Sequence, residues 1–151
     1  MREIKFRAWF SKQQKMVNVE EMEIYNGGVT VKAKTDWEKG GWYTQLRGAT
    51  NRKTVALGST RQVPRVILMQ YIGVKDKNGV DVYDGDIVQV KADDYELVIS
   101  EVKWGEVEYP AFDLPKYDGY GMNAFAAIYH SDPKETIEVI GNIYENPDLI
   151  S

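Results

Sequence analysis

The strongest structural signal in the chain is the run Val66-Ile67-Leu68-Met69-Gln70-Tyr71-Ile72, followed by Asp76-Lys77-Asn78-Gly79 and Val80-Asp81-Val82-Tyr83. The apolar run at 66–72 predicts a buried strand, and the alternation that begins at Val80 predicts a second strand. An Asn-Gly pair between two such runs is a strong hairpin signal, because a type I′ turn requires positive φ at both central residues. The sequence therefore predicts an antiparallel hairpin near its middle.

On both sides of this hairpin the chain shows further strand signals, in most places an alternation of apolar and polar residues with a period of two. These segments are 4–9, 29–34, 87–90, 97–104, 124–129 and 137–143. Helix signals are confined to two places. Asn18 stands three residues before Glu21, as in a capping box, and Asn146-Pro147 is typical of a helix start. Short strands with a turn signal about every 8–12 residues predict a mostly β fold, a barrel or a sandwich, with little helix.

The length and composition predict one compact folded unit. A chain of 151 residues, 43% of them apolar, can bury a core of its own. Within it we expect an N-terminal β-rich portion at 1–65, which carries a long loop, and a second portion at 66–151.

The chain has no cysteine, which excludes disulfides, thiolate nucleophiles and cysteine zinc sites. It also has no apolar run of about 18 residues and no signal peptide, so we expect a cytoplasmic protein without a membrane span.

Charge is divided unevenly along the chain. Residues 1–65 carry 13 Lys or Arg against 6 Asp or Glu, a net charge of +7. Residues 66–151 carry 6 against 17, a net charge of −11. An asymmetry of this size is typical of a surface that faces nucleic acid or a charged partner. Attraction between the two halves within one fold is the alternative, and it stays open.

The basic residues of the N-terminal portion are concentrated in a segment without regular periodicity. Residues 45–65 contain no acidic residue and follow an aromatic cluster that includes Trp42. Arginines neutralise phosphates, and exposed aromatic rings stack on unpaired bases. The sequence therefore predicts a nucleic-acid-binding site made of Arg47, Arg52, Lys53, Arg61, Arg65 and Trp42. A solvated loop, a loop folded on the acidic half and a site for an acidic protein are the alternatives.

Other polar clusters do not match known catalytic or metal-binding patterns. The densest comprises Asp76, Asn78, Asp81, Asp84 and Asp86. An EF-hand loop counted from Asp76 would need glycine at the sixth position and glutamate at the twelfth, where the chain has Asp81 and Ile87. Two neighbouring turns explain these residues better. His130 is the only histidine, and Glu106 and Glu108 share a strand face without a defined cleft. We therefore expect no metal, no cofactor and no enzymatic activity.

Three segments together resemble the YopX family of phage and prophage proteins. They are 2–9 (REIKFRAW), 68–88 (LMQYIGVKDKNGVDVYDGDIV) and 137–147 (IEVIGNIYENP). The resemblance implies a β-rich fold with an SH3-like barrel in the C-terminal part, and a phage or prophage gene in a bacterial host cell. It implies no activity, because the family has no assigned biochemical role, and no catalytic residue can be transferred from it.

These observations favour a non-catalytic binding module. We expect its basic segment to contact nucleic acid or a nucleic-acid-handling protein. The alternative is an accessory protein that self-associates, or docks on a host protein, through its opposite charges. Electrostatic contacts of that kind raise the association rate and the specificity more than the affinity.

Overall fold

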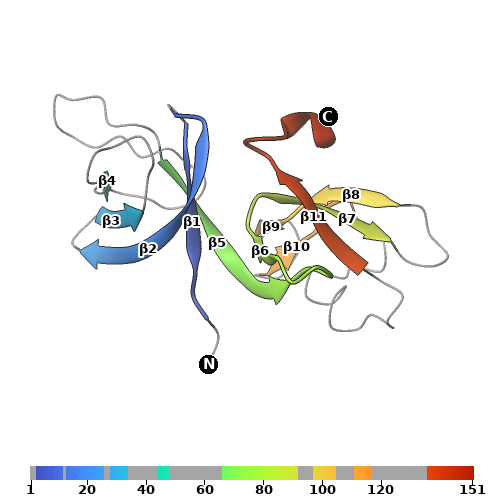
Figure 1. Cartoon of the computed structure of the whole chain (residues 1–151), viewed down its shortest axis with the longest axis horizontal. Coiled ribbons are helices and arrows are strands. Elements are labelled where there is room, and N and C mark those ends of the chain that lie inside the picture. The colour runs from blue at the N-terminus through green and yellow to red at the C-terminus, as the bar shows by residue number, and fades with distance from the viewer. Residues whose placement is uncertain are drawn as a thin grey trace. The chain divides into compact units, whose positions relative to one another are not determined.

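The structure is a computed structural model that describes residues 3–11, 13–25, 28–33, 44–47, 66–91, 97–104, 111–116 and 136–151. These residues form eleven strands and a single 3-10 turn, Pro147–Leu149 (Figure 1). The mostly β fold is therefore confirmed, and the chain end that begins at Asn146 is helical for one turn only. No helix in the described ranges is long and apolar enough to span a membrane.

The chain forms two compact units. One comprises residues 5–70, and the other comprises residues 1–4 and 71–151. Strand β5 (Val66–Lys75) contributes residues to both. The division predicted from the sequence, between residues 65 and 66, stays a prediction.

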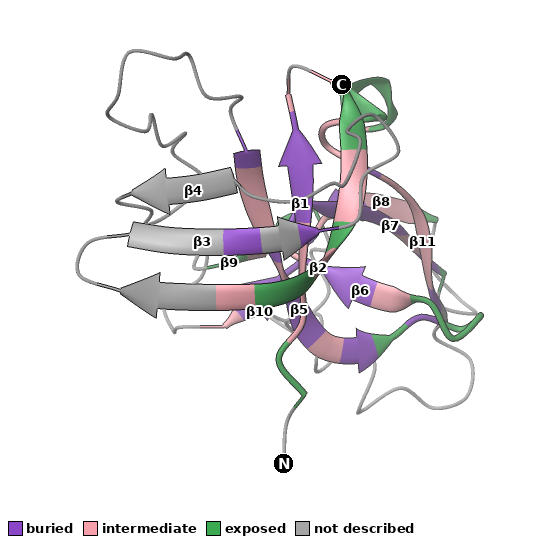
Figure 2. Ribbon diagram, turned by 60° about the vertical axis from the view of Figure 1, so that its left-hand side comes forward, coloured by how far each residue is buried: buried purple, intermediate pink, exposed green. Residues whose placement is uncertain are grey.

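The unit at 5–70 is an antiparallel sheet. Its order is β4 (Thr44–Arg47), β3 (Gly28–Ala33), β2 (Lys15–Tyr25), β1 (Phe6–Phe10) and β5. Ala8 on β1 lies opposite Val17 on β2 and Leu68 on β5. In this register the apolar side chains of the three strands lie on the same face of the sheet. The buried residues of the core that they form are Ala8, Phe10, Val31 and Val66 (Figure 2).

The prediction of a helix after Asn18 is wrong, because residues 15 to 25 form the continuous strand β2. The register between β2 and β3 shifts between Val19 and Glu21, which marks a β-bulge. A bulge inserts one extra residue and so moves the apolar alternation by one position. Val17 and Val19 lie in phase before the bulge, and Met22 resumes the alternation after it, opposite Val31. The shift in phase concealed the strand in the sequence.

The described residues of the unit that contains 71–151 form three small antiparallel ladders. In the first, β7 (Asp86–Lys91) lies between β11 (Thr136–Asn142) and β8 (Val98–Glu101). In the second, β9 (Lys103–Trp104) pairs with β10 (Phe112–Asp113), and in the third β5 pairs with β6 (Asp81–Tyr83). The core of this unit is formed by Ile72, Val74, Val82, Val88, Val90, Val102, Phe112, Leu114 and Ile137.

None of these ladders closes into a barrel among the described residues, so the SH3-like barrel stays a prediction. The strand predicted at 97–104 is interrupted at Val102, because this residue exchanges backbone hydrogen bonds with the turn at Gly85 and Asp86 (both 2.8 Å). The strand predicted at 124–129 lies outside the described residues.

The hairpin predicted around Asn78-Gly79 is confirmed, but its turn type is not. The backbone N–H of Gly79 donates to the carbonyl of Asp76 (3.0 Å), and the N–H of Asp76 donates to the carbonyl of Val80 (2.8 Å). Gly79 has φ +82°, whereas Lys77 and Asn78 have negative φ. The connection is therefore a type I turn followed by a left-handed glycine, a three-residue loop with a bulge rather than a two-residue type I′ turn.

Candidate functional site

Of the residues predicted to bind nucleic acid, the structure describes the backbone of one. Arg47 is the last residue of β4 and lies opposite Gly28 on β3. Arg52, Lys53, Arg61, Arg65 and Trp42 lie outside the described residues, as do His130, Glu106 and Glu108. The predicted site therefore stays a prediction.

The best-defined polar site lies at the hairpin between β5 and β6, where Asp76 is buried. One carboxylate oxygen of Asp76, Oδ1, accepts hydrogen bonds from the backbone N–H groups of Asn78 (2.8 Å) and Val80 (2.9 Å). The other oxygen, Oδ2, accepts one from the N–H of Val139 on β11 (3.1 Å). One side chain thus closes its own turn and joins that turn to a strand distant in sequence.

The environment of Asp76 stabilises its ionised form. Burial acts to raise the pKa of the carboxyl, but the three backbone donors, from Val139, Val80 and Asn78, act in the opposite direction. The net result is a pKa below the ordinary value for aspartate. An aspartate with a lowered pKa is a weak base near neutral pH, so this carboxylate is suited to holding backbone rather than to moving protons.

Polar side chains surround the contact between the turn and β11 on its solvent side. Glu138 forms an ion pair with Lys77 (Nζ to Oε2, 2.6 Å) and accepts hydrogen bonds from the side-chain amides of Gln89 and Asn78. The hydrogen bond from Lys77 is the main cause that lowers the pKa of the Glu138 carboxyl, and the one from Gln89 adds to it. We call the set of Asp76, Lys77, Asn78, Gly79 and Val80 the Asp76 turn.

The other carboxylates of the sequence cluster have partners of their own. Asp81 forms an ion pair with Lys75 on the same hairpin. Asp86 is fully buried and accepts a hydrogen bond from the backbone N–H of Tyr83 (2.8 Å). No group of three histidines or carboxylates within the described ranges has an arrangement that could hold a metal ion. Asp76 and Asp86 thus hold backbone N–H groups at turns, and Asp81 forms an ion pair within the hairpin.

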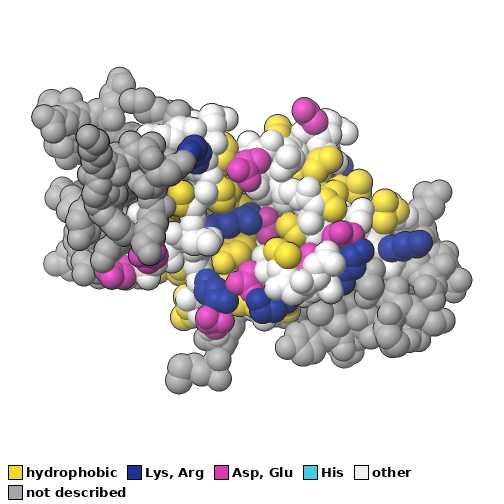
Figure 3. Space-filling view, viewed as in Figure 1, with side chains coloured by type: hydrophobic (Ala, Val, Ile, Leu, Met, Phe, Trp, Pro, Cys, Tyr) yellow, Lys and Arg dark blue, Asp and Glu magenta, His cyan; other side chains and the backbone are white. Residues whose placement is uncertain are grey.

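Charge separates along the structural division of the chain. Residues 5–70 carry 12 Lys or Arg against 5 Asp or Glu, a net charge of +7. Residues 1–4 and 71–151 together carry 7 against 18, a net charge of −11. Figure 3 shows basic and acidic side chains of the described residues on one face of the molecule. The asymmetry read from the sequence is therefore a difference between two folded units.

The contact between Asp76 and Val139 was not predicted from the sequence. An aspartate two residues before the Asn-Gly pair has the position from which its side chain can bond to the turn backbone, so that part could have been inferred. The partner on β11 lies 63 positions away, and no local pattern indicates it.

The fold and the site define a β protein of two units, in which a buried aspartate fixes a hairpin to a neighbouring strand. The chain belongs to the YopX family, because the family model described as YopX protein matches residues 5–151. Among solved structures, the crystal structure of protein EF1440 from Enterococcus faecalis is similar over all of both chains, with a TM-score of 0.59 and 22% identity. At this identity the likeness concerns the fold alone. No curated protein matches the chain.

Proposed function

We propose that this protein is a non-catalytic binding protein that contacts nucleic acid through its unit at 5–70. The observation that carries the proposal is the division of charge, +7 on this unit against −11 on the other. A polyanion such as nucleic acid is attracted to the first unit and repelled by the second. The charge division therefore favours complexes in which the unit at 5–70 faces the nucleic acid. Lys and Arg that neutralise phosphates release counterions, and this release supplies most of the affinity of non-specific nucleic-acid binding.

Within this unit we assign the contact to the segment at 45–65. Its five basic residues and the absence of acidic ones make it the densest positive stretch of the chain. Arg47 is the last residue of β4, the outermost of the described strands in its sheet, so the segment begins at the border of the described sheet. Trp42, just before β4, supplies a ring on which an unpaired base can stack, which favours single strands over duplexes.

The test is a fluorescence-anisotropy titration of labelled single-stranded and double-stranded DNA and RNA at 50 and 200 mM salt. If the protein contacts five phosphates, its affinity for nucleic acid is expected to fall about 100- to 500-fold when the salt concentration rises from 50 to 200 mM. Neutralising Arg47, Arg52, Lys53, Arg61 and Arg65 to glutamine is expected to abolish most binding and the salt dependence with it. Trp42→Ala is expected to weaken single-strand binding more than duplex binding.

A matched control removes the same number of charges elsewhere in the same unit. Lys12, Lys15, Lys32, Lys34 and Lys39 are changed to glutamine. If binding comes from the 45–65 segment, this control keeps most of the affinity. Equal losses in both variants would reject the segment and leave only a diffuse unit-wide attraction. No binding by the unmodified protein at 50 mM salt would reject the proposed function.

The same division of charge also favours a second candidate, an accessory protein that docks on a charged protein or on another copy of itself. The two candidates make different predictions. Charge-driven association gives an oligomer or a protein complex that dissociates at high salt and is indifferent to nucleic acid. Sedimentation of the purified protein at the same two salt concentrations separates the cases.

The proposal includes the cellular context and the finer fold inferred from the sequence. We place the protein in the cytoplasm of a bacterial cell that carries a phage or prophage, and we assign an SH3-like barrel to residues 66–151. The short antiparallel strands between 66 and 142 support the barrel. An experimental structure that showed an open sheet throughout this range would reject it.

A further inference from the structure

Asn78 and Gly79 lie at the tip of the Asp76 turn, and both residues are exposed. In the dipeptide Asn-Gly the side-chain amide of asparagine is lost more readily than before a larger residue, because glycine has no Cβ to hinder its backbone nitrogen. No atom of the described residues lies within 4 Å of the place that a Cβ of Gly79 would occupy. The turn therefore carries a chemically reactive pair at its surface.

Loss of this amide consumes water and needs no other reagent. The backbone nitrogen of Gly79 gives up its proton and attacks Cγ of Asn78, and the side-chain nitrogen leaves as ammonia. The product is a cyclic succinimide, which water then opens at either of its carbonyl groups. One opening gives aspartate, and the other gives isoaspartate, in which the main chain runs through Cβ and Cγ. In both products a neutral amide has become a carboxylate.

The folded turn restrains this reaction. The N–H of Gly79, which must lose its proton, donates to the carbonyl of Asp76 (3.0 Å). Asn78 also occupies the third position of a type I turn, where ψ is about 0°, and ring closure requires ψ to rotate well away from this value. The carboxylate of Asp76 holds the turn through the N–H groups of Asn78 and Val80 (2.8 and 2.9 Å). The reaction therefore proceeds when the turn opens.

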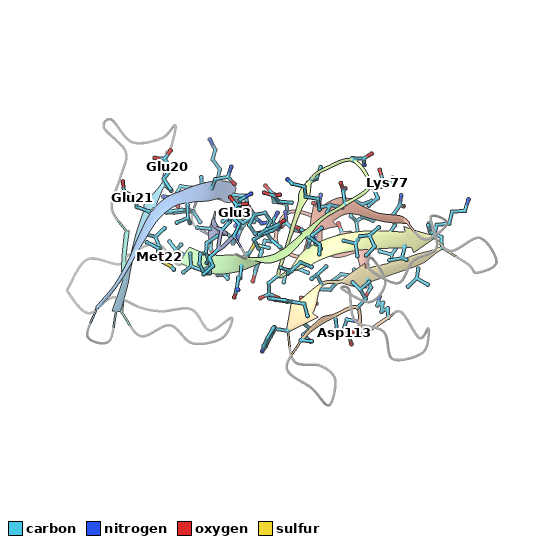
Figure 4. All side chains as sticks on the ribbon, turned by 90° about the horizontal axis from the view of Figure 1, so that it is seen from below. Glu3, Glu20, Glu21, Met22, Lys77 and Asp113 are labelled. Atoms are coloured by element: carbon cyan, nitrogen blue, oxygen red, sulfur yellow. The ribbon has the colours of Figure 1, made fainter. Side chains whose placement is uncertain are left out.

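A carboxylate at position 78 would lie beside the carboxylate of Glu138 on β11. The side-chain amide of Asn78 donates to Oε1 of Glu138 (3.4 Å), and Oε2 of Glu138 binds Lys77 (2.6 Å). Figure 4 shows Lys77 on the hairpin beside β11. Ionised aspartate has no donor to offer Glu138 and repels it. Because the pKa of Glu138 is lowered, its protonation does not relieve this repulsion near neutral pH.

Isoaspartate would also change the backbone of the turn. It adds one carbon to the main chain between the N–H groups of Asn78 and Val80, and these groups converge on a single oxygen, Oδ1 of Asp76. The lengthened chain cannot keep both hydrogen bonds with the same geometry. The other oxygen of this carboxylate binds the N–H of Val139 on β11 (3.1 Å), so the disturbance of the turn reaches that strand.

We propose that Asn78 is a modification site, at which slow loss of the side-chain amide loosens the attachment of the Asp76 turn to β11. Opening of the turn sets the rate of the modification, and the modified residue in turn favours the open form. The change runs in one direction, because the ammonia is lost to the solution and the amide does not form again.

The first test follows the modification by mass spectrometry during incubation in mildly alkaline buffer. Trypsin releases the peptide 78–91, whose only asparagine is Asn78, so the other Asn-Gly pair, Asn26-Gly27, is counted separately. We expect the amide of Asn78 to be lost about 10- to 100-fold more slowly in the folded protein than in the chain unfolded in guanidinium. Equal rates would overturn the restraint by the turn. No loss in the folded protein, after the unfolded chain has reacted fully, would overturn the site.

The dependence on the turn is tested with two variants that each remove one carboxylate from the hairpin. Asp76→Ala removes the acceptor of the N–H groups of Asn78 and Val80, and we expect its rate to rise toward that of the unfolded chain. Asp81→Ala removes the partner of Lys75 and is expected to keep the rate of the unmodified protein. Equal rates in the two variants would overturn the role of the Asp76 carboxylate.

The effect on β11 is tested with variants that do not depend on the folding of Asp76→Ala. Asn78→Asp reproduces the aspartate product, whereas Asn78→Ser is neutral and cannot form the ring. Both residues suit a turn, so the variants differ mainly in charge. We expect hydrogen exchange of the Val139 amide to be about three- to tenfold faster in Asn78→Asp than in Asn78→Ser. Equal exchange would overturn the release of β11.

A third variant tests the cause of this release. In a Glu138→Gln background the repelled carboxylate is gone, so the difference between Asn78→Asp and Asn78→Ser is expected to disappear. A difference of the same size in this background would overturn the repulsion by Glu138. An isoaspartyl-specific methyltransferase, applied to the aged protein, is expected to label the peptide 78–91, and its failure to do so would overturn the isoaspartate product.

Discussion

The carboxylate of Asp76 accepts a hydrogen bond from the backbone N–H of Val139, 63 positions further along the chain. The same carboxylate accepts two more from its own turn, at Asn78 and Val80. A short-range turn and a long-range contact between strands therefore depend on one side chain. The consequences for stability follow from this double role.

Removal of the Asp76 carboxylate is expected to destabilise the protein strongly. Asp76→Ala leaves three backbone N–H groups without their acceptor, and we expect the free energy of unfolding to fall by about 2–4 kcal/mol. Urea denaturation followed by tryptophan fluorescence measures the change. Asp81→Ala, which breaks the ion pair with Lys75 near the surface, is expected to cost about 0–1 kcal/mol. Equal losses in the two variants would contradict the special role of Asp76.

Stability is expected to depend on pH through Asp76, with a definite sign. Its pKa is lower in the folded protein than in the unfolded chain, where aspartate titrates at about 3.9. The stabilisation is therefore complete above that value and is lost as the pH falls through the folded pKa. Urea midpoints measured from pH 7 down to pH 2.5 are expected to fall less steeply below about pH 4 in Asp76→Asn. Parallel curves for both proteins would show that another carboxylate, such as Glu138, dominates the pH dependence of stability.

Gly79 is expected to tolerate asparagine better than alanine. Its φ of +82° is a left-handed conformation, but nothing lies within 4 Å of the position that a Cβ would occupy. Backbone strain alone therefore decides the cost, which we expect to be about 1 kcal/mol for Gly79→Ala. Asparagine adopts this conformation more readily, so Gly79→Asn is expected to cost less. A cost of several kcal/mol for both would indicate a steric conflict that the structure does not contain.

Gly141 is expected to be required for a steric reason. A Cβ at this position would lie 2.5 Å from Oδ1 of Asn146, which accepts a hydrogen bond from the N–H of Asn142. We expect Gly141→Ala to lower the free energy of unfolding by about 1–3 kcal/mol. In an Asn146→Gly background the obstructing atoms are gone, and the cost of Gly141→Ala is expected to be much smaller. A double-mutant cycle measures the difference, and additive costs would contradict the predicted contact.

Several local features were correctly predicted because the signals that determine them are local. The run at 66–72, the Asn-Gly pair and the alternation from Val80 predict a hairpin, and β5 and β6 form it. The predicted type of turn was wrong. The Asn-Gly dipeptide alone does not select the turn type, because loop length and the hydrogen bonds between Asp76 and Val80 also determine it. The helix at Asn18 was wrong because the bulge in β2 shifts its apolar positions by one residue.

The sequence by itself determined the strand-rich class, the central hairpin, the family and the concentration of positive charge before residue 66. Each of these depends on composition or on residues within about ten positions of one another. Only the tertiary structure decided that Asp76 meets Val139, that the backbone of Lys77 binds Ile137, and that the charge difference coincides with the division into two units. The physical reason is that pairing between strands distant in sequence depends on the packing of the whole core, and no short-range pattern records the partner.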